Sequence, residues 1–202
     1  MQIARLLGLT ACLLMADVAG GEARAETWRL NSDYAEVRFS WDNLGLSRQS
    51  ARFTEVEGTL HFTPTDPEGA WVEVRIPTAS LNSGAPKFDE LLRRSEFFAA
   101  SDHPYIIFKS SKVDKSGERT ARMVGDLTIR DATHPVTLDV VWNFTGPHPL
   151  ATVNPAYDGQ WVSGFSATGA VKRSDWGLDR GLPLVSDEVR ISIEVEFLLD
   201  RG

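Results

Sequence analysis

The sequence predicts an all-β protein with one short helix, folded as an eight-stranded antiparallel β-barrel. First, polar and apolar residues alternate over about eight stretches, as in strands with one buried and one solvated face. Second, most connections between these stretches are short. Third, only residues 86–98 show helical periodicity. Closing eight strands on themselves removes exposed edges and leaves room for side chains or one ligand, so a barrel is favoured over a sandwich.

The first three strands are expected before residue 43, over residues 53–62 and over residues 72–76. Residues 43–50 and 63–69 are polar and contain glycine or proline, which is typical of turns. Apolar residues recur at every second position of the strands, so they should share the inner face of the sheet. The expected inward residues are Val37, Phe39, Trp41, Val56, Leu60, Phe62, Val72, Val74 and Ile76.

The helix is expected over Pro86–Phe98. Proline suits the first helical position, Asp89 lies in the first turn and Arg93 lies near the last, so the charges complement the helix dipole. A helix of about three turns is marginal alone in water, so its apolar face must pack on something large. We expect it to pack on the mouth of the barrel. The stripe on that face comprises Phe88, Leu91, Leu92, Ser95 and Phe98.

Five more strands should follow the helix. They begin at Pro104 and at about residues 122, 136, 161 and 189. Small residues on their inward parity, Gly125 and Ala167, favour a cavity over a solid core. The apolar residues at the alternating, inward-facing positions of these strands are Met123, Leu127, Ile129, Val136, Leu138, Val140, Trp142, Phe144, Trp161, Phe165, Val171, Val189, Ile191, Ile193, Val195 and Phe197.

Two connections are long. Phe144–Gly159 contains three prolines and two glycines, and we interpret it as a solvated loop. Arg173–Asp187 joins the last two strands and is expected to form a turn of helix followed by a flap.

Residues 1–25 resemble a cleaved secretion signal. Arg5 precedes an apolar run, and Ala23-Arg24-Ala25 has the small-x-small pattern of a signal peptidase site. A lipoprotein with a lipidated Cys12 is the alternative. We therefore expect residues 26–202 to form a single domain, exported to the periplasm.

Composition limits the partners and the chemistry. The net charge of −7 argues against nucleic acid and against an anionic membrane surface as the main partner. No apolar run after residue 25 is long enough to span a bilayer. Cleavage after Ala25 would remove the only cysteine, and the four histidines are scattered, so no metal site is expected.

Several motifs resemble a known family in the family's own order. They are Leu-Arg-Arg-Ser-Glu-Phe-Phe-Ala at 92–99, His-Pro-Tyr-Ile-Ile-Phe-Lys-Ser at 103–110, the strand-turn-strand at 125–138, and the late strand running into Arg-Ser-Asp-Trp-Gly at 164–178. Together they resemble the YceI-like, lipocalin-like polyisoprenoid-binding proteins of bacteria. One departure is Asp131, which stands where the family usually has a turn glycine.

The resemblance implies a lipocalin-like barrel that binds an isoprenoid lipid, such as a quinone or a polyprenyl chain, with no cofactor and no catalysis. Burying one five-carbon unit offers roughly 4 kcal/mol before association costs. The alternative for the apolar residues is a barrel filled by its own side chains. The expected apolar lining is Phe39, Phe62, Val74, Leu91, Phe98, Leu127, Leu138, Val140, Trp142, Phe165 and Ile193.

Arg173 and Asp175 are the candidates for contact with a lipid head group, because Arg173 shares the inward parity of its strand. Alternatively, Arg173 forms an ion pair with Asp175 or Asp89. No nucleophile stands in a recognisable catalytic motif.

Two other functions stay open. One is an enzyme that acts on an apolar substrate through Arg173, Asp175 and His103. The other is an accessory module that binds a membrane redox or envelope-stress partner through the loop Phe144–Gly159. The sequence also leaves a homodimer open.

Overall fold

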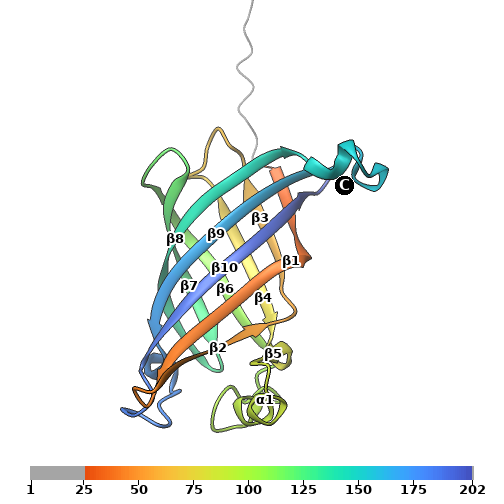
Figure 1. Cartoon of the computed structure of the whole chain (residues 1–202). Coiled ribbons are helices and arrows are strands. Elements are labelled where there is room, and N and C mark those ends of the chain that lie inside the picture. The colour runs from red at the N-terminus through yellow and green to blue at the C-terminus, as the bar shows by residue number, and fades with distance from the viewer. Residues whose placement is uncertain (1–25, 202) are drawn as a thin grey trace, which may run out of the picture.

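Eight strands close into an antiparallel barrel in the computed structural model, which describes residues 26–201 (Figure 1). Around the barrel the order is β1, β3, β4, β6, β7, β8, β9 and β10, and β10 pairs with β1 to close it. The predicted fold class is therefore confirmed. Strands β2 and β5 extend the sheet outside the closed wall.

The strands are β1 (Glu26–Asn43), β2 (Ser47–Phe53), β3 (Glu57–Phe62), β4 (Trp71–Pro77), β5 (Leu81–Asn82), β6 (Tyr105–Lys115), β7 (Thr120–Ile129), β8 (Ala132–Pro147), β9 (Trp161–Lys172) and β10 (Glu188–Leu199). The helices are α1 (Pro86–Arg93) and four single turns, η1 (Thr78–Ser80), η2 (Pro149–Thr152), η3 (Pro155–Tyr157) and η4 (Arg173–Trp176).

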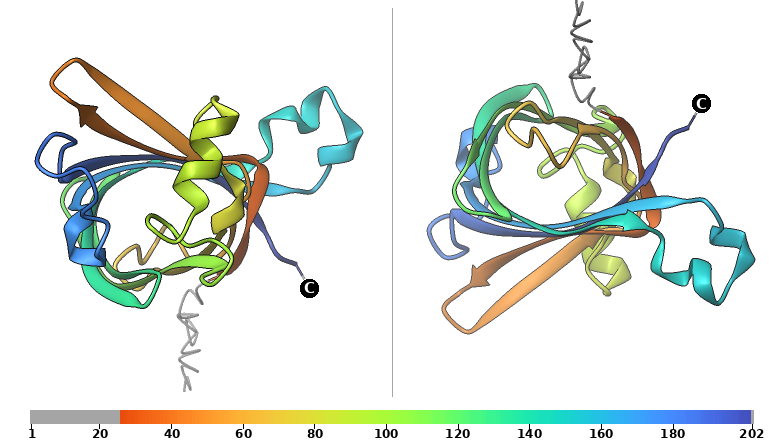
Figure 2. Two further views of the ribbon diagram at one scale, coloured as in Figure 1. Left: turned by 90° about the horizontal axis from the view of Figure 1, so that it is seen from below. Right: turned by 90° about the horizontal axis from the view of Figure 1, so that it is seen from above.

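Strand β1 pairs with β10 along one edge and with two strands, β3 and β2, along the other edge. Its start, Glu26–Arg29, pairs with β3, whereas its end, Val37–Asn43, pairs with β2. The β1–β2 hairpin therefore leaves the barrel wall and projects from it (Figure 2). The prediction of a turn over residues 43–50 and one strand over residues 53–62 was therefore wrong, because two strands, Ser47–Phe53 and Glu57–Phe62, occupy this stretch. Strand β2 lies outside the wall and its first residues have no buried face, so no alternation marks them.

Helix α1 is shorter than predicted and lies across the lower mouth of the barrel (Figures 1 and 2). It ends at Arg93, because Arg94 adopts an extended backbone with ψ 167°. The chain then turns back through Ala99 at φ 48°, and the Phe98 N–H donates to Leu92 O at 3.0 Å. This turn returns Phe98 to the barrel although it lies beyond the helix.

A bulge in β8 corrects another expectation. The pairing of β8 with β9 shifts register between Trp142 and Phe144. An extra residue reverses the side to which later side chains point. As a result Trp142 faces the interior, while Phe144 is exposed. Trp161, which pairs with Pro147 at the start of β9, is also exposed, contrary to its predicted inward position.

The long β8–β9 connection forms η2 and η3 in an arm that projects from the upper end of the barrel (Figures 1 and 2). Most of its residues are exposed, as expected for a solvated loop. The imidazole of His148 is buried against the ring of Tyr157, with 4.1 Å between the ring centroids.

Candidate functional site

An apolar cavity of about 450 Å³ runs along the interior of the barrel. All eight strands of the closed wall contribute side chains to it, as do α1, the β6–β7 turn and the flap between β9 and β10. Its volume lies within the range of pockets that hold small molecules, roughly 300–1,000 Å³. An eight-stranded barrel of this kind is wide enough to hold one ligand.

The structure places ten of the eleven predicted lining residues on the cavity. Leu91 is the exception, and Leu92 takes its place on the inner side of α1. Phe88 and Leu92, four residues apart, form the stripe that faces the barrel. The ten are Phe39, Phe62, Val74, Phe98, Leu127, Leu138, Val140, Trp142, Phe165 and Ile193.

The inward side chains do not fill the interior. Val140, Phe165 and Ile193 point inward yet remain only half-buried, so their accessible surface faces the cavity. Ala167 also lines the cavity, as its small size predicts. Gly125 was a wrong indicator, because the ring of Phe108 fills the space beside it.

Aromatic side chains close the lower mouth under α1. The Phe39 ring lies 5.5 Å from Phe53, 5.7 Å from Trp41 and 6.0 Å from Phe98, measured between centroids. Phe88 of α1 approaches Trp41 at 5.9 Å. These spacings are typical of packed aromatic pairs. The helix is thus held on the mouth by side chains that also line the cavity.

Arg173 holds the flap. Its guanidinium donates to the carbonyl oxygens of Ser186 at 2.8 Å, Arg180 at 2.9 Å and Val185 at 3.1 Å, and to that of Leu178. Burial lowers the pKa of the guanidinium, while the nearby carboxylates of the flap oppose that shift. The side chain reaches the cavity, as its parity predicted, but its N–H groups are bonded to the backbone.

The other polar candidates lie elsewhere. Asp175 is exposed and does not line the cavity. Asp89 is buried and accepts the Ser83 N–H at 2.7 Å, so the expected ion pair of Arg173 with Asp175 or Asp89 is not formed. His103 Nδ1 lies 3.6 Å from a carboxylate oxygen of Asp131. Arg173, Asp175 and His103 are therefore not brought together as a polar cluster.

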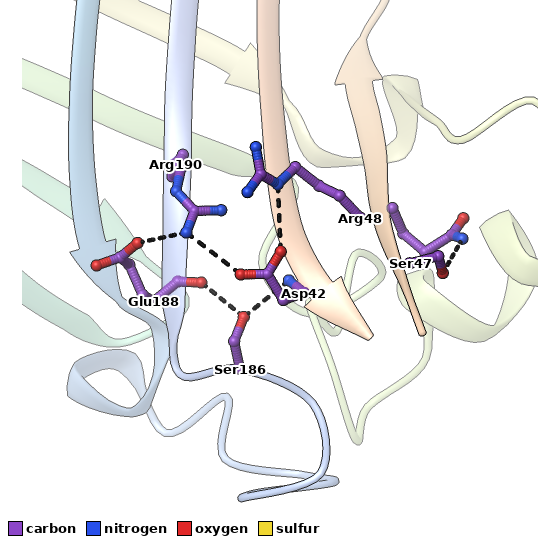
Figure 3. A network of polar contacts seen from close by, with 7 residues as sticks. Asp42, Ser47, Arg48, Ser186, Glu188 and Arg190 are labelled. Atoms are coloured by element: carbon purple, nitrogen blue, oxygen red, sulfur yellow. Dashed lines mark hydrogen bonds and ion pairs between the residues drawn. The ribbon is translucent and has the colours of Figure 1, made fainter. Parts of the chain in front are cut away.

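A polar network fastens the flap to the end of β1 (Figure 3). The Asp42 carboxylate accepts one hydrogen bond from Arg190 of β10 and one from Arg48 of β2, both at 3.2 Å. These bonds, with that of Arg190 the stronger influence, hold the pKa of Asp42 below its usual value. The Asp42 N–H donates to the Ser186 hydroxyl at 3.0 Å, and the Ser186 N–H donates to Asp42 O at 2.9 Å.

A second carboxylate anchors the start of the flap. Asp187 accepts the backbone N–H of Ser174 at 2.9 Å and its hydroxyl at 2.8 Å. The bond from the backbone N–H is the main cause of the lowered pKa of Asp187.

Acid should loosen the flap before it unfolds the barrel. Both carboxylates have a lower pKa in the folded protein than in the unfolded chain, where it is about 3.9. Their stabilisation is therefore present above that value and is lost as the pH falls through the folded pKa. Hydrogen exchange at the amides of Ser174 and Ser186, corrected for the intrinsic rate, should show protection at about pH 6 that is reduced at about pH 3.

Asp42→Asn and Asp187→Asn should show weak protection at both pH values. Asp139→Asn, on the barrel wall, is the control and should behave as wild type. Equal protection of the flap at both pH values in wild type would contradict the assignment.

The comparisons with known proteins agree with this architecture. The protein-family model of the YceI-like domain matches residues 28–197 of the sequence. The chain belongs to the YceI-like family. Among its YceI-like relatives, Protein YceI of Escherichia coli O157:H7 is 32% identical over 193 residues, which cover 95% of both chains. A UPF0312 protein of Serratia proteamaculans is also 32% identical with the same coverage.

Several solved structures share the barrel. The YceI protein of Campylobacter jejuni matches with a TM-score of 0.67 at 26% identity, covering 78% of this chain and 88% of that one. BcnA of Burkholderia cenocepacia matches with a TM-score of 0.72 at 19% identity, over 83% and 98% of the two chains. A polyisoprenoid binding domain from Saccharophagus degradans has a TM-score of 0.59 at 12% identity, over 88% and 100%. The last two likenesses concern the fold alone.

Some cavity residues of this YceI-like chain carry no signal in the sequence. Trp176 of η4 is buried against the cavity and donates its indole N–H to Leu127 O at 3.0 Å. At the other end, Lys115 and Arg119 flank the β6–β7 turn and line the cavity, and the Arg119 guanidinium lies 5.6 Å from the Trp142 ring centroid. All three lie outside the alternating apolar pattern, so only the closed barrel shows which way they point.

Residues 26–201 contain no cluster of histidine, cysteine, aspartate and glutamate able to hold a metal ion. Within the same range, no helix is long and apolar enough to cross a membrane. The expected signal at 1–25, with the alternative at Cys12, lies outside the described residues.

Proposed function

We propose that the protein binds an isoprenoid lipid, a quinone or a polyprenyl chain, in the barrel and carries or sequesters it without changing it chemically. The observation that supports this best is the apolar cavity itself, which extends from α1 to the β6–β7 turn. An apolar space that reaches both ends of the barrel suits a flexible chain. The polyisoprenoid binding domain of Saccharophagus degradans, which shares the fold, adds support.

Affinity would come from the tail leaving water. Each buried CH₂ equivalent contributes about 0.8 kcal/mol, so a few isoprene units offset the cost of association. We do not retain Arg173 and Asp175 as the head-group site, because the first is bonded to flap carbonyls and the second is exposed. Lys115 and Arg119 line the upper end of the cavity, and Arg119 donates one N–H to Asn143 O at 2.9 Å where Arg173 makes four such bonds, so we propose these two cations for a polar head group instead.

The lower mouth is the proposed gate. Helix α1 and the flap both cover it, and both contribute side chains to the cavity. We also propose a periplasmic location, on the strength of the signal-like sequence at 1–25.

Native mass spectrometry of the protein purified from the periplasm tests the function. We expect a stoichiometric adduct that releases an isoprenoid on organic extraction, on a chain whose intact mass corresponds to cleavage after Ala25. An apo protein that also fails to bind quinones and polyprenyl phosphates on titration would overturn the proposal.

A further inference from the structure

Three exposed leucines meet at the lower end of the barrel, on two different loops. Leu44 and Leu46 lie in the β1–β2 turn and are 50% and 82% exposed, and Leu184 of the flap is 68% exposed. The Leu44 N–H donates to Leu184 O at 2.9 Å, and Asn43 forms a β-bridge with Val185. The two loops are therefore held side by side. We call these three residues the leucine tip.

Leu44 is unfavourable at its position by two criteria. The N–H of Leu46 donates to Asn43 O at 2.9 Å, which closes a four-residue turn with Leu44 at φ 57° and Gly45 at φ 67°. A turn with positive φ at both central residues favours Asn-Gly, because a branched side chain is strained in the left-handed region. Leu44 is half exposed, so burial does not offset this strain. Neither the backbone nor packing within the chain accounts for a leucine here, and such a local conflict points to a function.

The leucine tip is fixed rather than loose. The network of Asp42, Arg48, Ser186 and Arg190 joins β1, β2, β10 and the flap (Figure 3). Its members Asp42, Arg48 and Ser186 lie two residues along the chain from the three leucines. A preorganised apolar tip loses little conformational entropy when it is buried.

The tip also adjoins the cavity. Asn43 and Val185 line the cavity, and they are the chain neighbours of Leu44 and Leu184. The arm between β8 and β9 lies at the opposite end of the barrel (Figure 1), and its Val153 is 76% exposed. Exposed apolar residues thus occur at both ends, but the leucine tip stands next to the lower mouth.

We infer that the leucine tip inserts into the surface of a lipid bilayer and so places the lower mouth against the membrane from which lipid is taken up. This inference rests on the proposed function, since a lipid carrier must meet the bilayer that holds its ligand. A bilayer suits the tip better than a protein partner does. Three side chains on convex loops bury far less than the roughly 800 Å² per partner of a stable protein interface. A fluid surface accepts such a tip without a complementary pocket.

The binding should not depend on anionic lipid. The chain carries a net charge of −7, so attraction to a negative surface is not the expected source of affinity. The apolar side chains should carry it instead.

Co-flotation with zwitterionic phosphatidylcholine vesicles tests the inference. The variant is Leu44→Asn, Leu46→Ser and Leu184→Ser combined, and the control is Val153→Ser, an equally exposed apolar residue at the far end. We expect wild type and the control to float with the vesicles equally. The triple variant should bind at least ten-fold more weakly.

Two further measurements on the same proteins separate loss of membrane binding from misfolding and from loss of quinone binding. The thermal midpoint of the triple variant should equal or exceed that of wild type, because asparagine suits the left-handed position of Leu44. Uptake of a quinone delivered in detergent should be unchanged, because none of the three leucines lines the cavity. Failure of uptake in wild type and variant alike would contradict the proposed function, while flotation still reports on the tip.

Other results would overturn the inference. One is wild type that does not float, or a triple variant that floats as wild type does. Another is a wild-type dimer that the triple variant converts to monomer, since the leucine tip would then pack on a second copy of the chain.

Discussion

Replacing Val140 with tryptophan should weaken lipid binding at least ten-fold while the barrel stays folded. Val140 lines the cavity near the β6–β7 turn, and its neighbours across the sheet are Ala121 on β7 and Ala167 on β9. These small neighbours leave room for an indole ring, so the ring should occupy the space proposed for the lipid tail. We expect at least ten-fold weaker binding of a quinone, equivalent to a loss of about 1.4 kcal/mol.

The matched control is Val141→Trp. Val141 follows Val140 on the same strand but faces solvent, so its replacement adds the same bulk outside the barrel. It should bind lipid as wild type does. Thermal midpoints of both variants should remain within a few degrees of wild type, because a side chain that fills a cavity gains contacts. Lipid binding retained by a folded Val140→Trp protein would show that the ligand does not occupy the barrel interior.

Side-chain parity was enough to predict most of the cavity wall. Where a strand has one buried and one solvated face, alternation alone assigns each side chain, as in β10 from Val189 to Phe197. The same logic failed in β2, where Ser47–Ser50 lie outside the closed wall and have no buried face to mark. It failed again at Phe144, because a bulge in β8 changes the parity without a sequence signal.

Contacts between distant segments were beyond the sequence. Parity correctly pointed Arg173 inward, but the carbonyls that bind it belong to residues up to 13 positions later. Backbone carbonyls leave no trace in the sequence, so carboxylates were the natural expectation. The turn between β7 and β8 is similar, since Arg130, and not Asp131, takes the positive φ.

The helix illustrates a limit of periodicity. Leu91 and Leu92 are adjacent on the predicted stripe, and only the docked helix shows that Leu92 reaches the cavity. The aromatic residues after Arg93 extend the helical pattern, although they return to the barrel through a turn. A pattern of apolar residues therefore predicted that this segment packs on the mouth, but not where the helix ends.

Gly125→Ala should cause the largest loss of stability of any methyl-sized change in the barrel wall. A Cβ at Gly125 would lie against the Phe108 ring and 2.6 Å from Lys109 O. The ring packs against the core and can shift only toward the cavity, whereas the carbonyl belongs to the paired strand β6 and cannot move without disturbing the wall. Overpacking of this kind costs about 2–3 kcal/mol, which would lower the thermal midpoint of a chain this size by roughly 4–12 °C.

Gly164→Ala in β9 separates this clash from the general effect of glycine in a strand. There the nearest atom to a new Cβ is 4.0 Å away. Alanine restricts the unfolded chain more than glycine does, so this variant should be neutral or more stable by about 0.5–1 kcal/mol. Comparing the thermal midpoints of the two variants shows whether the clash at Gly125, and not the replacement of a strand glycine as such, destabilises the barrel. Equal thermal midpoints for Gly125→Ala and Gly164→Ala would mean that the Phe108 ring moves aside easily. Gly125 would then adjoin space that belongs to the cavity, as first predicted.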